Sequence, residues 1–392
     1  MQSVSEHEVI VVGAGPGGAA TAAALARRGR DVLIVDRAGF PRDKICGDAV
    51  SLGCIKIMNG LGMAEKVRGA VARGEFYPLT GMRLFSPGGR MLQAGFRGGE
   101  NGDHSYVAPR IFLDALLQRH ALDCGACWLQ ADVQEPLIED GRVVGVLARE
   151  NGELRAHRAR VVVGADGVTS TIMRHLRPPA NQHVDKHRAV ALRAYVEGFE
   201  IFPHEVEFYL YDEILPGYAW IFPTAAHTAN VGLGVRLDVF RTHKKNLKKM
   251  FAEFMAMPTI RERVRPGNRV RDVAVWQLNF GSQKRLQHAY DGALLVGDAA
   301  GFINPLTGGG IENALISGCL AADTISKALH TRDTSREVLH EYEQRCNEEM
   351  GSGMRKSFFY QRVLLNYPTV VDFLIRYMGQ HGGVAKTFLS KL

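Results

Sequence analysis

One segment near the start of the chain constrains its fold more than any other. The β-branched run at residues 8–12 (EVIVV) leads into a glycine turn, GAGPGG, at residues 13–18. An alanine-rich stretch follows and ends at Gly29, and a second apolar run at residues 31–36 (DVLIVD) ends in an acid. This order predicts a strand, a helix and a second strand that form one βαβ unit of a parallel sheet.

The glycines of this turn have distinct physical roles. Gly13 permits the tight turn, Gly15 lets the backbone approach a pyrophosphate, and Gly18 allows the helix to pack on the strand. The start of the helix offers free N–H groups and a partial positive charge to phosphates. Asp36, about twenty residues further on, is placed to accept hydrogen bonds from a ribose. The unit therefore predicts dinucleotide binding.

Two later segments indicate a return to the same sheet. Residues 160–167 (RVVVGADG) form an apolar run that ends at Asp166, and residues 292–300 (GALLVGDAA) form another that reaches Asp298. Between them, from about 176 to 285, aromatic and β-branched residues alternate with turns, which is typical of an antiparallel sheet. The dinucleotide-binding domain is therefore predicted to be discontinuous, with a second domain inserted into it.

The predicted fold class is α/β (α+β overall): a Rossmann-like domain, an inserted antiparallel β-sheet substrate domain and C-terminal helices. With 392 residues, of which 46% are hydrophobic and 23% charged, the chain can bury a large core without disulfides or a structural metal. The predicted boundaries are 1–75, 105–175 and 286–330 for the first domain, 76–104 and 176–285 for the second, and 331–392 for the C-terminal region.

The six cysteines are scattered, and no metal site is predicted. Cys124 and Cys127 form a C-x-x-C, but no second pair or histidine pair stands at zinc-ligand spacing. The N-terminal residues lack a basic segment, and no run of about eighteen apolar residues occurs. A cytoplasmic location with reduced thiols is therefore expected.

The net charge of +7 suits an anionic cofactor, an anionic membrane or nucleic acid. Nucleic-acid binding is not expected, because no known module or aromatic platform accompanies the basic residues. Lysines 244, 245, 248 and 249 are predicted to form the solvated face of one helix. The sequence predicts no particular oligomeric state.

Basic and aromatic residues alternate near the C-terminus. This pattern predicts either peripheral contact with the inner face of a membrane or a helix packed on the protein's own surface. The residues concerned are Arg355, Lys356, Phe358, Phe359, Tyr360, Arg362, Phe373, Arg376, Lys386 and Lys391.

The glycine turn, Asp166-Gly167 and Gly297-Asp298, in this order, resemble the FAD-binding marks of the para-hydroxybenzoate-hydroxylase fold. Within that superfamily, PRDKICGD at residues 41–48 is similar to the segment after the second strand in geranylgeranyl reductases. YAWIFP at residues 218–223 matches their Y-x-W-x-F-P motif, where flavin halogenases have W-x-W-x-I-P. The chain thus resembles the geranylgeranyl reductase family of FAD-dependent oxidoreductases, to about residue 325.

The resemblance implies FAD as the bound dinucleotide and assigns its contacts. Arg110 would reach the pyrophosphate, Val133 the adenine, and Asp298 the ribityl or pyrophosphate region. A helix that starts near Gly310 would stabilise negative charge on the flavin. The full set of expected cofactor residues is Gly13, Gly15, Gly17, Gly18, Asp36, Arg37, Cys46, Gly47, Arg110, Val133, Asp166, Asp298, Gly309, Gly310 and Ile311.

The electron donor is expected to bind only transiently. No second G-x-G-x-x-G follows a strand, so a stable NADPH domain is not predicted. The expected donor is NAD(P)H or a ferredoxin-like protein.

Tyr218, Trp220 and Phe222 alternate along a predicted strand and therefore share one face of the sheet. Such a stripe is by itself more typical of a core than of a pocket. The resemblance implies that the stripe lines a cavity beside the flavin, where a hydrophobic prenyl substrate binds. Cys46, Tyr218 and Trp220 are accordingly the expected catalytic residues.

The leading functional hypothesis is an FAD-dependent reductase that saturates carbon–carbon double bonds of a geranylgeranyl-type isoprenoid. The same fold supports a monooxygenase or a halogenase that acts on an aromatic or polyketide substrate. A non-enzymatic flavin-binding module would leave the Cys46 segment and the aromatic strand without a purpose.

Overall fold

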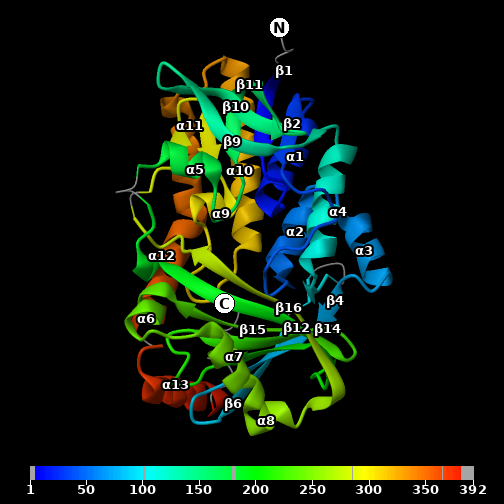
Figure 1. Cartoon of the computed structure of the whole chain (residues 1–392), viewed down its shortest axis with the longest axis vertical. Helices are drawn as coiled ribbons and strands as arrows, with labels where there is room; N and C mark the ends of the chain where they lie inside the picture. The colour runs from blue at the N-terminus through cyan, green and yellow to red at the C-terminus, as the bar shows by residue number, and fades with distance from the viewer. Residues whose placement is uncertain are drawn as a thin grey trace.

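The computed structural model describes residues 5–96, 98–99, 103–178, 182–284, 286–363 and 365–380. Figure 1 shows an α/β part above and a broad antiparallel sheet below, with the C-terminal helices running down one side. The chain passes between the two parts several times, as the sequence predicts for a discontinuous first domain.

The first sheet has a parallel centre that is buried on both faces. The strand β1 (Ser5–Val12) lies between β11 (Glu153–Gly164) and β2 (Val32–Asp36), parallel to both. Its inner residues are β-branched and buried, as parallel strands between helical layers require. The remaining strands are β8 (Cys127–Gln130), β9 (Asp132–Glu139), β10 (Arg142–Glu150), β17 (Ala289–Tyr290) and β18 (Ala293–Leu295).

Two helices pack closely against this sheet and against each other. Every residue of α1 (Pro16–Ala26) is buried, which explains its alanine-rich composition. A Cβ on Gly318 of α10 (Ile311–Thr331) would lie 2.4 Å from the carbonyl oxygen of Gly17, so only glycine permits this approach. The other helices of this part are α2 (Leu52–Gly60), α3 (Ala64–Ala72), α4 (Arg110–Asp123), α5 (Thr171–Leu176), α9 (Gly297–Ala300) and α11 (Arg336–Cys346).

The second sheet has seven strands in the order β16-β12-β15-β14-β13-β5-β6. All neighbours are antiparallel except β13 and β5, which pair in parallel. The strands are β5 (Gly81–Phe85), β6 (Met91–Gly95), β12 (Arg188–Phe199), β13 (Glu205–Tyr209), β14 (Tyr218–Ala225), β15 (Thr228–Arg236) and β16 (Val264–Asn279). A segment near residue 80 therefore joins the inserted sheet, as predicted.

A third, small sheet joins the two parts. It consists of β3 (Ala49–Val50), β7 (Ser105–Val107) and β4 (Tyr77–Leu79), with β7 in the middle. Residues 77–79 were expected in the substrate domain, but they pair with this sheet instead because β7 offers both of its edges.

Short helices cover the outer face of the second sheet, namely α6 (Leu237–Thr242), α7 (Leu247–Ala256) and α8 (Pro258–Arg261). A 3-10 turn, η3 (Asp185–His187), lies just before β12 and contacts α6. The prediction of one lysine-rich helix is wrong. Lys244 has a left-handed backbone with φ 45°, so it and Lys245 precede α7, and only Lys248 and Lys249 lie within it.

The C-terminal helices return from the first part to the second. A π-helical turn (Asn347–Gly351) leads into α12 (Ser352–Val363), and α13 (Pro368–Gln380) packs under the second sheet (Figure 1). Val371 and Ile375 contribute to an apolar cluster there, and Asp372 accepts a hydrogen bond from the Gly88 amide at 2.9 Å. Within the described residues, none of the helices has the length and apolar character needed to cross a membrane. Lys386 and Lys391 lie outside the described residues.

Candidate active site

The glycine turn forms a cradle that a side chain would fill. A Cβ on Gly13, which has φ 99°, would lie 2.5 Å from the carbonyl oxygen of Ala165. A Cβ on Gly18 would lie 1.9 Å from the carbonyl oxygen of Gly13. A Cβ on Gly15, by contrast, would have open space around it, because its nearest heavy atom, in the Arg42 side chain, would be 3.9 Å away. The turn is therefore tight on its inner side and open on the side that faces a ligand.

The first helix presents unpaired backbone donors to this open side. Gly15 is the N-cap of α1 and provides no side-chain hydrogen bond to the helix, so the first amides stay available for an anion. Asp36 lies at the carboxyl end of β2, next to the turn. Its carboxylate is fixed by the amide of Ala14 at 2.8 Å and by that of Ala38 at 3.0 Å. Arg37 is exposed beside it, and Val133 is buried in β9.

A buried cluster of charges supports the cradle from α4. Arg110 is 3% exposed and donates two hydrogen bonds to Asp114, at 2.6 and 2.7 Å. Arg42 donates a third to the same carboxylate at 2.8 Å. Two guanidinium groups thus share the Asp114 carboxylate, and Arg42 also lies 3.9 Å from the Asp36 carboxylate, so two cations and two carboxylates meet beside the glycine turn. The sequence analysis missed Arg42, although it stands in the PRDKICGD segment.

Asp166 has a structural role in the described contacts. It lies behind the glycine turn and accepts hydrogen bonds from Ser170 at 2.5 Å and from the Thr171 amide at 2.6 Å. These contacts cap α5. The carboxylate therefore fixes the loop whose backbone abuts Gly13.

The start of α10 forms the opposite end of the cradle. Gly310 is its N-cap and gives the helix no side-chain hydrogen bond, and Ile311 is its first residue. A Cβ on Gly310 would lie 3.2 Å from the Asp298 carboxylate, which places these two residues side by side. Lys44 forms an ion pair with Asp298 at 2.9 Å. Although burial raises the pKa of Asp298, Lys44 outweighs it, so the pKa lies below its usual value.

The aromatic strand β14 faces this end of the cradle. The ring centroids of Tyr218, Trp220 and Phe222 follow each other at 6.0 and 6.2 Å. The Tyr218 hydroxyl donates a hydrogen bond to the carbonyl of Thr307, in the loop before α10. Gly232 on β15 makes room for the indole, since a Cβ there would lie 2.2 Å from Trp220.

The Cys46–Gly47 turn packs directly against the same strand. A Cβ on Gly47 would lie 3.1 Å from the Phe222 ring and 3.5 Å from Nε1 of Trp220. The structure thus brings together the three predicted aromatic residues, the cysteine and the start of α10, which come from separate parts of the chain. Phe208 on β13 adds a further ring, whose centroid lies 5.2 Å from that of Phe222 and 5.5 Å from that of Tyr218. These rings, together with Trp220, form the aromatic wall.

A hydrogen-bond network joins this turn to the second sheet. Trp220 Nε1 donates to Asn230 Oδ1 at 2.9 Å, and Asn230 Nδ2 donates at 2.8 Å to both the Cys46 carbonyl and the Asp48 carboxylate. The Tyr195 hydroxyl donates to the same carboxylate oxygen at 2.6 Å. The sequence analysis missed Asp48, Tyr195 and Asn230. Asp48 belongs to the PRDKICGD motif at residues 41–48, whereas no local sequence pattern marks Tyr195 or Asn230.

Burial controls the protonation of this network. Asp48 is fully buried, which raises its pKa to about 6, although hydrogen bonds from Tyr195 and Asn230 favour the charged form. Burial also raises the pKa of the Cys46 thiol above its usual value, and Arg110 offsets this only in part. Cys46 therefore carries its proton at neutral pH.

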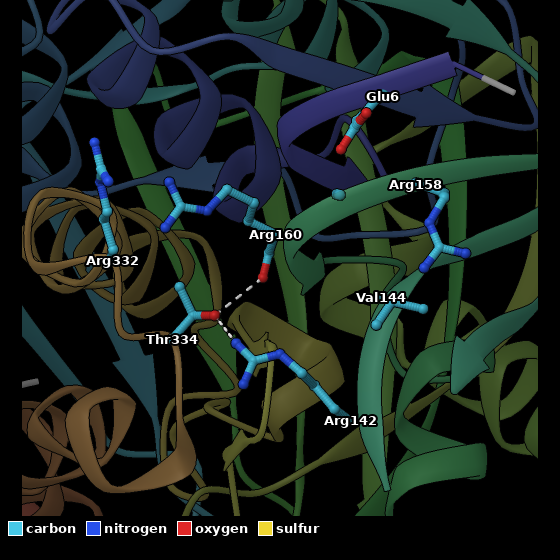
Figure 2. A pocket seen from close by; sticks show the side chains of 8 residues that line it. Glu6, Arg142, Val144, Arg158, Arg160, Arg332 and Thr334 are labelled. Atoms are coloured by element: carbon cyan, nitrogen blue, oxygen red, sulfur yellow. Dashed lines mark hydrogen bonds between the residues drawn. The ribbon is translucent and has the colours of Figure 1, made fainter. Parts of the chain in front are cut away.

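A separate basic pocket lies away from this site. Figure 2 shows Arg142, Arg160 and Arg332 around Thr334. The pocket that they line has a volume of about 260 Å³. It is built from β1, β10, β11 and the chain after α10, and none of the predicted site residues lines it. Within the described part of the chain, no group of three or more His, Cys, Asp or Glu side chains is arranged to hold a metal ion.

The residues of the cradle fit FAD. An uncapped helix start faces the open side of Gly15, a fixed carboxylate stands at the end of β2, and a second uncapped helix start lies at the opposite end of the cradle. Residues 6–355 match the model of the FAD binding domain family. The chain is an FAD-dependent oxidoreductase, as predicted.

More specific relatives share most of the chain. The digeranylgeranylglycerophospholipid reductase of Methanocella arvoryzae is 30% identical over 92% of this chain and 88% of its own length. One such reductase of Methanopyrus kandleri is 32% identical over 88% of this chain and 87% of its own length. The chain belongs to the geranylgeranyl reductase family of flavoproteins, which confirms the resemblance.

Solved structures agree on the fold. A geranylgeranyl bacteriochlorophyll reductase-like protein from Thermoplasma acidophilum superposes with a TM-score of 0.83 at 25% identity, over 96% of this chain and 92% of that one. A myxobacterial chondrochloren halogenase superposes with a TM-score of 0.75 at 23% identity, over 92% of this chain and 82% of that one. The second likeness concerns the fold alone. The individual contacts assigned to FAD and substrate stay predictions.

Proposed function

We propose that the protein saturates carbon–carbon double bonds of a geranylgeranyl-type chain. The observation that carries this proposal is the aromatic wall of β14, which lies between the Cys46–Gly47 turn and the start of α10. Apolar burial binds a prenyl chain without polar partners. The archaeal relatives named as digeranylgeranylglycerophospholipid reductases support a lipid-linked form of this substrate.

The reaction needs an acid as well as a hydride. An isolated trisubstituted alkene has no carbonyl to accept electrons, so direct hydride attack would produce an unstabilised carbanion. Protonation first gives a tertiary cation, to which bound reduced FAD supplies a hydride from N5.

Cys46 is the proton donor in this proposal. Its thiol is protonated at neutral pH, because burial raises its pKa, and its turn contacts Trp220 and Phe222 through Gly47. The faces of the aromatic rings stabilise the positive charge, and their burial keeps water from the cation. Tyr218 ties the wall to the loop before α10 and so sets the distance between substrate and cofactor.

The electron donor and the membrane contact are part of the proposal. NAD(P)H or a ferredoxin-like protein would reduce the cofactor in a transient encounter. The C-terminal helices and the turn between them expose Phe359, Tyr367 and Phe373, which are 60%, 59% and 63% exposed, near Arg362 and Arg376. Exposed aromatic and basic residues suit the interface of an anionic membrane, where a lipid substrate resides.

Anaerobic incubation tests the reductase function. The dithionite-reduced enzyme is mixed with prenyl substrates, namely a diphosphate, a quinone and a glycerophospholipid, and the products are analysed by mass spectrometry. We expect products that have gained two hydrogen atoms per saturated bond. Oxygen transfer to an aromatic compound in air, without any saturation, would instead support a monooxygenase.

Flotation with liposomes tests the membrane contact. Binding to anionic vesicles should weaken as salt increases, and Phe373→Ser should reduce it. Equal recovery of both proteins in the unbound fraction would reject the contact.

A further inference from the structure

Asp48 occupies an unusual position between the two domains. Its side chain is fully buried, and its backbone is in the left-handed region with φ 66°. The Oδ2 oxygen accepts hydrogen bonds from Tyr195 and Asn230, but Oδ1 has no hydrogen-bond partner among the described residues. The Asp48 amide donates to the Cys46 sulfur at 3.3 Å. A buried carboxyl thus lies beside the proposed proton donor with one free oxygen.

Tyr195 connects this carboxyl to a cavity of about 490 Å³. The cavity lies between the start of α4 and the edge of the second sheet, and its lining includes Phe112, Thr228, Arg271 and Tyr195. The Tyr195 ring lies close to two guanidinium groups, whose carbons are 4.5 Å (Arg193) and 4.9 Å (Arg271) from the ring centroid. Tyr195 therefore both lines this cavity and donates a hydrogen bond to Asp48.

We infer that Tyr195 and Asp48 form a proton relay that returns a proton from this cavity to the Cys46 thiol after each reduction. The inference rests on the proposed function, in which Cys46 protonates the alkene. It gives a role to a carboxyl that is fully buried, in a position where an unpaired charge is costly.

The proton balance of the relay is simple. The S–H bond of Cys46 breaks as the substrate carbon gains its proton, which leaves a thiolate. The thiolate takes the proton of the Asp48 carboxylic acid. The carboxylate then takes the phenolic proton of Tyr195, while water in the cavity reprotonates the phenol in the same step. One proton enters from solvent for each double bond.

Several charged and titratable groups surround the relay. Asp48 faces Arg193 and Tyr195 from β12, Arg110 from α4 and the Cys46 thiol from its own loop, where Lys44 also acts on the thiol. Burial raises the pKa of the Tyr195 phenol far above its usual value, so the phenolate does not accumulate. Because the pKa of Asp48 is about 6, its acid form declines as pH rises above that value.

Tyr195→Phe is the sharpest variant, because it removes the hydroxyl and keeps the ring beside Arg193 and Arg271. Asp48→Asn removes the proton but keeps a residue that tolerates a positive φ. The matched control is Tyr209→Phe. Tyr209 lies in the same sheet and donates an equally short hydrogen bond, 2.6 Å, to the buried Glu207, away from Cys46.

The kinetic test separates the first turnover from later ones. In holoenzyme equilibrated near pH 7, Cys46 starts protonated, so Tyr195→Phe should reduce the first double bond at the wild-type rate. Later turnovers should slow by at least ~10-fold, as expected when a positioned proton-transfer group is lost. Steady-state turnover of the wild type should fall as pH rises above about 6, and Asp48→Asn should lose this pH dependence. Tyr209→Phe should match the wild type in every respect.

An infrared titration of the substrate-free holoenzyme tests the relay without turnover. The stretching band of a buried carboxylic acid should disappear with a midpoint near pH 6, be absent in Asp48→Asn, and shift in Tyr195→Phe but not in Tyr209→Phe. If the wild type converts prenyl substrates but Tyr195→Phe shows normal later turnovers, the relay is wrong and the reductase function stands. If the band titrates but no prenyl substrate is converted, the reductase function fails and the relay has no role in it.

Discussion

The two halves of the active site are built in opposite ways. The glycine turn and Asp36, which form the first end of the cofactor cradle, lie within one βαβ unit of residues 5–36, so their geometry follows largely from local backbone constraints. The inter-domain network of Cys46, Asp48, Tyr195, Trp220 and Asn230 joins segments that are up to 184 residues apart in the chain. A short sequence motif therefore determines the first half, whereas the second half forms only when distant segments of the chain come together in the folded protein.

This difference has a chemical counterpart. The cradle presents backbone amides, which cannot change their charge and which bind a phosphate whatever reaction follows. The inter-domain network presents a thiol, a carboxyl and a phenol, whose protonation depends on burial. Binding and chemistry are thus separated, and substitutions in the two halves should fail in different ways.

The largest effect should come from the tight side of the cradle. Gly18→Val places atoms within 1.9 Å of the Gly13 carbonyl, so the variant should lose several kcal/mol of stability or not fold. Gly15→Val should keep its fold, because the nearest atom to a Cβ there is 3.9 Å away, but should bind no FAD. Thermal unfolding and the flavin absorption spectrum measure the two properties separately. Flavin retention in Gly15→Val would contradict the assigned cradle.

A smaller effect is expected at Asp48, and it depends on pH. The folded protein holds this proton up to about pH 6, against 3.8 for an unperturbed carboxyl, so wild-type stability falls as pH rises across this range. Asp48→Asn does not titrate there and should gain stability relative to the wild type, by up to about 3 kcal/mol above pH 6. Urea unfolding at pH 4.5 and 7.5 measures the difference. An equal offset at both values would mean that the carboxyl is charged throughout.

The loss of the Asp36 carboxylate should lower the affinity for FAD without abolishing binding. Asp36→Ala removes the carboxylate expected to accept hydrogen bonds from the ribose and its hydrogen bond from the Ala14 amide, so FAD affinity should fall about 10-fold or more. Titration of the apoprotein with FAD measures this. Unchanged affinity would place the ribose elsewhere.

The predictability of the site follows the same division. The βαβ unit, the discontinuous domain and the aromatic strand are visible in the sequence, because periodicity and glycine spacing report local structure. Tyr195 and Asn230 gave no signal, since each is an ordinary strand residue until the sheet docks on the Cys46 turn. The lysine helix failed for a related reason: charge spacing alone does not show that Lys244 takes a left-handed turn.

The smallest effect is expected at two surface lysines that lie outside both halves of the active site. Lys248 and Lys249 are exposed on α7, so replacing both by Gln should change stability by no more than about 0.5 kcal/mol and leave FAD binding and turnover unchanged. A large change in stability, FAD binding or turnover would show that these two lysines interact with the rest of the protein or with a ligand.

Trp220 and the rest of the aromatic wall are proposed to bind a prenyl chain beside FAD and to stabilise the cation formed during its reduction. The most direct test compares the wild type and Trp220→Ala in the anaerobic prenyl assay, with flavin content and photoreduction measured on the same samples. The account predicts that the variant binds FAD and is reduced normally, while saturated product falls ~10-fold or more, which corresponds to ~1.4 kcal/mol of lost transition-state stabilisation. Wild-type product formation by a folded, flavin-loaded Trp220→Ala protein would contradict it.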